Sequence, residues 1–127
     1  MATGIIHLDT SFLIECFKHG SESSRRLDSF IRDGNAFEVS MMAWAEWLCG
    51  PLKPAEKGLA KELIGAIHPV TESQAELAAF LFNETDRRPR SLADCIIAAC
   101  AMDQGVHLAT NNLKHFKPFV AHGLKLA

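Results

Sequence analysis

The chain of 127 residues has the length of one ordinary domain, and its 48% hydrophobic and 22% charged residues suffice for a buried core. The net charge of −2 provides no general attraction for nucleic acid or membrane, so a polyanionic partner would need a local group of cations or a metal ion. Apolar runs are far shorter than the roughly 20 residues that span a bilayer, and the first residues lack the basic segment of a signal peptide, so a single cytoplasmic domain over residues 1–127 is expected.

The first part of the chain predicts strands that alternate with helices. The apolar residues 5–8 predict a strand, and Asp9, Thr10 and Ser11 directly after it offer an acid and two hydroxyls that suit the start of a helix. The segments that follow are predicted, in order, as a helix between residues 21 and 33, a strand at 36–40, a short helix at 41–50, a helix at about 54–65 and a strand at 66–70. Pro69 places this last strand at a sheet edge or near its own end.

The second part continues the alternation. Its predicted segments are a helix from Thr71 through about Phe82, a loop at 83–90, a helix from Ser91 to about Gln104, a strand at 106–110, a turn or short helix at 111–116 and a possible edge strand at 123–127. Ser91 and Asp94 have the spacing of a capping box, which would open the helix that Gly105 ends.

Strands separated by helices predict an α/β fold, a three-layer α/β/α sandwich with a mostly parallel central sheet. In such sheets a ligand site lies beyond the carboxyl ends of the strands. Asp9 follows the first strand, and Asn111 and Asn112 follow the strand at 106–110, so all three are expected at that edge.

Three acids stand alone in apolar segments: Asp9, Glu46 and Asp94 are each the only charged residue in a stretch of ten or more. Asp9 and Asp94 have an alternative role as helix caps or partners of a helix dipole, whereas Glu46 has apolar neighbours on every side and no evident polar helix face. A charge buried without a partner is costly, and no Lys or Arg lies in these segments. A divalent metal ion such as Mg²⁺ or Mn²⁺, which prefers oxygen ligands, is therefore the expected partner.

A metal held by carboxylates suits phosphodiester hydrolysis, and the wider sequence pattern resembles a known family. The stretch Asp9-Thr10-Ser11 after an apolar strand, Glu46 in a short helix ending WLCG, Asp94 within ADCIIAACA, and the closing LATNNLKHF together resemble a PIN domain. The resemblance covers nearly the whole chain, and the short single domain is similar to a VapC-type ribonuclease toxin.

This resemblance implies a metal-dependent endoribonuclease that is inhibited by a small cognate antitoxin protein and is usually a homodimer. Asp9 and Asp94 match the principal metal-binding aspartates of the family, and Glu46 matches the glutamate of the same cluster. Asn112 stands at a fourth position that is commonly acidic, and His115 stands where some relatives place another acid. These two departures leave a second metal ion open.

The resulting hypothesis is that Asp9 and Asp94 hold one Mg²⁺ or Mn²⁺ while Glu46 binds metal or positions the attacking water. The substrate would be tRNA or another structured RNA, with Asn112 holding water or phosphate by hydrogen bonds. The candidate substrate-binding residues are hydroxyls near the acids and the arginines ahead of Asp94: Thr10, Ser11, Thr110, Arg87, Arg88 and Arg90. A solvated basic loop is the alternative for the arginines.

Two other functions remain as alternatives. A phosphoaspartate enzyme also places an aspartate after its first strand, but the sequence lacks the second aspartate of a D-x-D motif. A PIN-like binding module, catalytically weak because of the neutral Asn112, is the stronger alternative.

Several apolar and sulfur-containing side chains allow two interpretations. Trp44 and Trp47 suit a core, or a groove that an antitoxin segment or a second subunit fills. The four cysteines form no C-x-x-C pair and suit reduced, packed thiols. His7 and His68 fall in predicted strands, where ordinary packing is the expectation.

Overall fold

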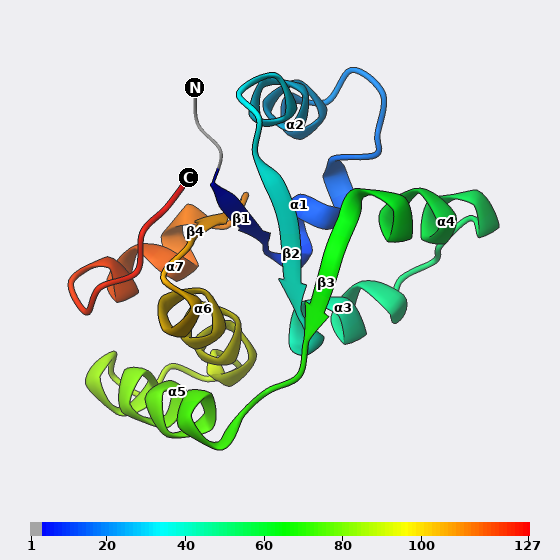
Figure 1. Cartoon of the computed structure of the whole chain (residues 1–127). Helices are drawn as coiled ribbons and strands as arrows, with labels where there is room; N and C mark the ends of the chain where they lie inside the picture. The colour runs from blue at the N-terminus through cyan, green and yellow to red at the C-terminus, as the bar shows by residue number, and fades with distance from the viewer. Residues whose placement is uncertain (1–3) are drawn as a thin grey trace.

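The computed structural model describes residues 4–127, and its centre is a four-stranded parallel sheet (Figure 1). The strands are β1 (Ile5–Leu8), β2 (Ala36–Ser40), β3 (Ile64–His68) and β4 (His107–Ala109), in the order β3-β2-β1-β4. Every pairing is parallel, as crossovers through helices require. The predicted α/β fold is therefore confirmed.

Helices cover both faces of this sheet. They are α1 (Thr10–Glu15), α2 (Glu22–Arg32), α3 (Met41–Leu48), α4 (Pro54–Leu63), α5 (Glu72–Glu84), α6 (Leu92–Gln104) and α7 (Leu113–Val120). Figure 1 shows α5, α6 and α7 on one side of the sheet and the first four helices on the other. Among the described residues, no helix combines the length and apolarity needed to cross a membrane.

The two faces of the central strands differ in polarity. Because side chains alternate along a strand, Ile6 and Leu8 of β1 join Phe37 and Val39 of β2 in the core beneath the first helices. His7 therefore points to the opposite face. Burial lowers the pKa of His7 to about 4, so its imidazole is neutral near pH 7.

The boundary between α4 and β3 lies earlier than the sequence pattern suggested. The prediction of a helix at 54–65 and a strand at 66–70 is wrong in its limits, because Ile64 is already extended and pairs with Phe37. Burial of Ile64 against the core favours pairing at this point. β3 ends at His68, directly before Pro69, which has no N–H to donate to a sheet.

The starts of α5 and α6 differ in how they are capped. Thr71 begins α5 in a reciprocal capping box with Gln74, as its position at the predicted start requires. The capping box predicted for Ser91 and Asp94 is wrong: Ser91 has helical backbone angles, and its hydroxyl donates to the Arg88 carbonyl at 2.8 Å. With this backbone, which differs from the extended one of Thr71, the Ser91 side chain accepts no hydrogen bond from the first amides of α6.

The possible edge strand at 123–127 is reduced to one bridge. Leu126 pairs in parallel with Leu108 of β4, and the Leu108 N–H donates to the Lys125 carbonyl at 2.9 Å. The chain end therefore lies beside β4 without adding a regular strand.

Candidate functional site

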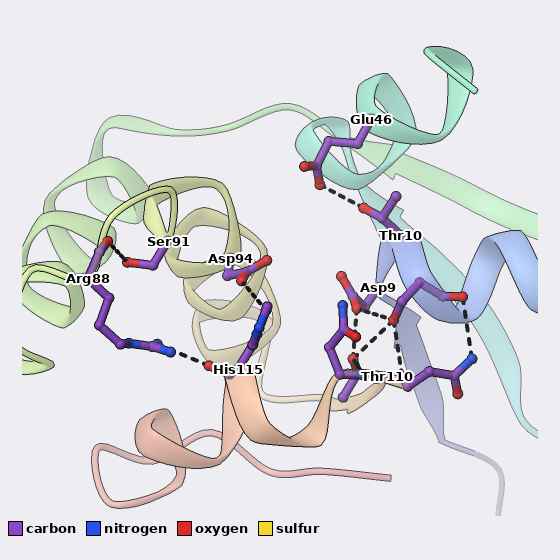
Figure 2. A network of polar contacts seen from close by, with 11 residues as sticks. Asp9, Thr10, Glu46, Arg88, Ser91, Asp94, Thr110 and His115 are labelled. Carbon is purple, nitrogen blue, oxygen red and sulfur yellow. Dashed lines mark hydrogen bonds and ion pairs between the residues drawn. The ribbon is translucent and has the colours of Figure 1, made fainter.

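Asp9 stands directly after β1, at the carboxyl end of a central strand, and is 2% exposed. It occupies the N-cap position of α1, yet its side chain makes no capping hydrogen bond. Its Oδ2 instead accepts hydrogen bonds from Ser11 Oγ at 2.6 Å and from Thr110 Oγ1 at 2.7 Å. The capping alternative for Asp9 is therefore wrong, and two hydroxyls fix the orientation of a buried carboxylate (Figure 2).

Further hydrogen bonds connect the end of β4 with the start of α1. The Asp9 N–H donates to the Ala109 carbonyl at 3.0 Å, and the Asn111 N–H donates to Ser11 Oγ at 3.1 Å. The Asn111 side chain then reaches Ser23 Oγ at 2.7 Å. Sequence reasoning placed Asn111 at this edge but missed Ser23, because nothing in its helix pattern distinguishes it from a solvent-facing serine.

Glu46 lies on the exposed face of α3, and this corrects the sequence interpretation. The helix buries only Ala43, Trp44 and Trp47, so the rotation of about 100° per residue turns Glu46 outward. Thr10 Oγ1 donates to Glu46 Oε1 at 2.7 Å. The burial argument for a metal therefore does not apply to Glu46, but the bond to Thr10 holds its carboxylate over the start of α1.

Asp94 lies in the first turn of α6, and its side chain is 20% exposed. Burial is the main cause that raises its pKa to about 6, with the negative charges of Asp9 and Glu46 adding to the effect. Nearby positive groups act in the opposite direction, and His115 Nδ1 lies 3.4 Å from Asp94 Oδ2. The nearby positive groups therefore do not offset the effect of burial and of the two negative charges on the pKa of Asp94.

The three acids come from α6, α3 and the end of β1, and Figure 2 shows them around one region of the structure. The negative charges of Asp9 and Glu46 add to burial in raising the pKa of Asp94. Within residues 4–127, however, they do not form a triplet whose ligand atoms all lie within 4.8 Å of one another. Hard oxygen donors and uncompensated negative charge fit Mg²⁺ or Mn²⁺, and Mg²⁺ commonly retains several waters, so not every acid has to bind directly.

Asn112 lies at the N-terminus of α7 with its side chain exposed. Its N–H donates to Thr110 Oγ1 at 2.9 Å, and its carbonyl accepts from the His115 N–H at 2.9 Å. The backbone of Asn112 thus connects Thr110 with His115. His115, which the family resemblance placed where some relatives have another acid, lies beside Asp94.

Comparison with known protein families assigns most of this chain. The PIN domain matches residues 6–118, a segment that contains every acid of the site. The chain belongs to the PIN domain family. A search of curated proteins finds no match.

Solved structures resemble this PIN domain over almost its full length. VapBC2 from Rickettsia felis, bound to a DNA fragment from its promoter, has a TM-score of 0.75 at 20% identity, covering 97% of both chains. A toxin–antitoxin complex from Klebsiella pneumoniae has a TM-score of 0.70 at 25% identity, covering 87% of this chain and 89% of that one. VapC20 from Mycobacterium tuberculosis, a sarcin–ricin loop cleaving toxin, has a TM-score of 0.69 at 17% identity, covering 96% and 98%.

Of the three predicted arginines, the structure brings Arg88 to the acids of this PIN domain. Its Nη2 donates to the His115 carbonyl at 3.1 Å, and its charge lowers the pKa of Asp94 (Figure 2). Arg87 is exposed, bonds to the Asn83 side chain and lies over the Phe82 ring. Arg90 is exposed with a left-handed backbone, φ 64°. Arg88 thus lies at the site, whereas Arg87 lies against α5 and Arg90 is exposed.

Thr110 also borders a cavity of about 340 Å³ next to the acids. Its lining includes the polar Ser23 and Asn111 together with the positive Arg26 and the acidic Glu15 and Glu22, so groups of both charges face it.

Proposed function

We propose that this PIN domain is a Mg²⁺- or Mn²⁺-dependent endoribonuclease and the toxin of a type II toxin–antitoxin pair. The observation that carries the proposal is the Asp9, Glu46 and Asp94 group, in which Asp9 is buried and oriented by two hydroxyls and the pKa of Asp94 is raised by burial and then by the charge of Asp9. Such a group favours binding of a cation and serves hydrolysis of a phosphodiester.

Asp9 and Asp94 would hold the metal ion, which supplies a water of lowered pKa and neutralises charge on the phosphate. Ser11 and Thr110 keep the Asp9 carboxylate in one orientation through their hydroxyls. Thr10 holds Glu46, whose exposed carboxylate would orient the attacking water. These hydroxyls act on the acids more directly than on RNA, which changes the role expected of them from the sequence.

RNA would approach over the region between Arg88 and the cavity beside Thr110. Arg88 is the arginine nearest to Asp94, and it would contact a phosphate next to the scissile one. Arg87 and Arg90 would add salt-dependent attraction from the exposed loop. One structural neighbour is described as cleaving the sarcin–ricin loop, which supports structured RNA as the class of substrate.

A small antitoxin protein is the proposed partner. An apolar groove of about 540 Å³ is lined by residues that include Ile14, Phe17, Trp47 and Leu52. Amphipathic segments bind such grooves through their apolar side chains. Structural neighbours were solved as toxin–antitoxin complexes, which supports this occupant. A homodimer is the proposed assembly, and light scattering of the purified chain measures it.

The alternative is a binding module that keeps the acids but cleaves RNA weakly or not at all. The neutral side chain of Asn112 favours this alternative, because it provides no fourth negative charge. Cleavage by the purified chain distinguishes the two functions directly.

The test is cleavage of tRNA and structured RNA by antitoxin-free protein in Mg²⁺, in Mn²⁺ and in EDTA. We expect metal-dependent cutting that Asp94→Asn lacks and that Asp28→Asn keeps, because Asp28 is an exposed acid on α2. No cutting by folded protein under any condition would favour the binding module. Equal cutting by Asp94→Asn would reject the proposed site.

A further inference from the structure

A second group of ligand-type side chains lies on the sheet face that α6 covers. His7 of β1 and Glu38 of β2 are register partners, and His68 of β3 pairs with Ser40, two residues beyond Glu38. Since alternate residues share a face, all three side chains project to the same side of the sheet. They are separate in sequence, and the parallel pairing brings them together.

His7 is 1% exposed, and neither of its ring nitrogens has a hydrogen-bond partner among residues 4–127. A neutral imidazole has one donor and one acceptor nitrogen, and buried polar atoms are nearly always paired because desolvation without a partner is costly. The sequence interpretation of ordinary packing does not account for this. Both ring nitrogens, beside a carboxylate, are therefore free to bind a ligand.

Glu38 faces both histidines through one oxygen. Its Oε1 lies 2.7 Å from His68 Nε2 and 3.8 Å from His7 Nε2. The second distance is too long for a hydrogen bond. The two imidazole rings stack with centroids 5.5 Å apart and an angle of 17° between their planes. Two ring nitrogens and one carboxylate oxygen thus converge on one small region.

We propose that His7, Glu38 and His68 form a Zn²⁺ site that is distinct from the acid cluster. Their ligand atoms all lie within 4.8 Å of one another, the only such group of three among the described residues. Zinc bonds of about 2.0 to 2.2 Å in tetrahedral geometry place ligand atoms roughly 3.3 to 3.6 Å apart, so small side-chain rotations complete the site. The proton between His68 Nε2 and Glu38 moves to the other ring nitrogen or to solvent when zinc binds.

The types of ligand atom distinguish this zinc site from the cluster of Asp9, Glu46 and Asp94. Two imidazoles and one carboxylate suit zinc and other borderline metals, whereas the oxygen donors of Asp9, Glu46 and Asp94 suit Mg²⁺ or Mn²⁺. With three protein ligands, a water would take the fourth position. His68 and Glu38 are 24% and 19% exposed, so an ion can reach His7 from the side of edge strand β3.

Zinc at this position would join β1, β2 and β3 on the face opposite Trp47 and the apolar core. Because His7 lies two residues before Asp9, the same ion would fix the strand that carries the acid. The site is independent of RNA cleavage, so its test does not depend on the proposed function.

The test is isothermal titration of metal-stripped, reduced protein with ZnCl₂, together with the absorption spectrum of the Co²⁺-loaded protein. We expect one tight Zn²⁺ per chain in wild type, in Asp94→Asn and in His115→Gln. The last two variants remove the other carboxylate–histidine pair, Asp94 with His115. His68→Gln and Glu38→Gln should weaken binding by about 100-fold or more, since each removes one of three protein ligands.

Cys49→Ser removes the exposed thiol and should bind zinc as wild type does. X-ray absorption of the Zn²⁺-loaded Cys49→Ser protein should show imidazole and oxygen ligands without sulfur. This measurement needs no folded ligand variant. Four results would each overturn the proposal. The first is wild-type zinc affinity in both His68→Gln and Glu38→Gln, and the second is loss of zinc binding only in Asp94→Asn or His115→Gln. The others are sulfur ligation of the zinc and the absence of tight zinc binding.

Discussion

Thr110 donates its hydroxyl to Asp9 at 2.7 Å, across 101 positions of sequence. The bond connects the end of β4 to the end of β1, two neighbouring strands of the parallel sheet. Both residues are buried, so the hydroxyl determines how the carboxylate faces the site.

Thr110→Val removes this donor and leaves the shape of the side chain nearly unchanged. We expect cleavage to fall by about 10-fold to 100-fold, because a residue that orients a metal ligand has effects of that size. The free energy of unfolding should fall by about 1 to 3 kcal/mol, since a buried carboxylate loses a partner. Thr110→Ser keeps the hydroxyl and is the matched control. Cleavage rates and urea unfolding measure both effects, and equal rates in all three proteins would contradict this role.

Asp94→Asn should stabilise the metal-free protein at high pH while it abolishes cleavage. The pKa of Asp94 is raised from 3.8 to about 6, so its protonated form favours folding. This stability is fully present below pH 3.8 and is lost as the pH rises through about 6. The melting temperature of the variant in EDTA should therefore exceed that of wild type more at pH 8 than at pH 4. A difference that does not change with pH would contradict the assignment.

Metal binding should weaken as the pH falls below about 6, because the raised pKa of Asp94 makes protons compete with the cation. The apparent dissociation constant for Mn²⁺ should rise by up to about 10-fold for each pH unit that a single proton controls. Titration of Mn²⁺ into the chain at pH 5 and pH 7.5 measures it. His115→Gln tests whether the neighbouring ring contributes to the same profile, since the two groups lie 3.4 Å apart.

Glu46→Gln should reduce RNA cleavage while it leaves the free energy of unfolding nearly unchanged. Glu46 is exposed, so the free energy of unfolding should change by no more than about 0.5 kcal/mol. Cleavage should fall markedly if its charge orients the attacking water, and Thr10→Val, which removes the 2.7 Å bond, should have a smaller effect in the same direction. Rates at saturating metal provide the measurement. An active Glu46→Gln would assign catalysis to the two aspartates alone.

Arg88→Gln should weaken RNA binding more than Arg87→Gln does. Arg88 is close enough to lower the pKa of Asp94, whereas Arg87 bonds to Asn83 on α5. Loss of one phosphate contact should reduce the slope of log K against log salt by about 0.7 for single-stranded RNA. Binding of a non-cleaved RNA by Asp94→Asn protein across a salt series measures it. Equal effects from the two arginines would indicate general attraction by the loop.

The alternation of strands and helices, and the positions of the three acids within it, could be predicted because both depend on local sequence patterns. Short apolar runs between capped helices define the parallel sheet, and Asp9 interrupts such a run where a strand ends. The environment of Glu46 could not be predicted from its apolar neighbours, since in an eight-residue helix only Ala43, Trp44 and Trp47 face the core. The capping box at Ser91 was wrongly predicted because residue spacing does not reveal that Ser91 has helical backbone angles.

The contacts that prepare Asp9 were less accessible to sequence reasoning. Thr110 was recognised as a candidate, but its hydrogen bond to Asp9 depends on which strands are neighbours. In sequence, His7 resembles any other histidine of a strand. The strand register places it beside Glu38 and His68, and only the structure shows that its ring nitrogens have no partner within the described residues. Pairing across the sheet joins residues far apart in the chain, so local sequence patterns do not reveal it.

The bond from Thr110 to Asp9 also has a consequence for the time at which the acid site is complete during synthesis of the protein. Asp9 leaves the ribosome early, but Asp94 and Thr110 are translated 85 and 101 residues later. A nascent or prematurely terminated chain that lacks β4 carries Asp9 and Ser11 without the second hydroxyl that orients the carboxylate. A ribosome that makes this protein is therefore exposed to an assembled site only when translation of the domain is almost finished.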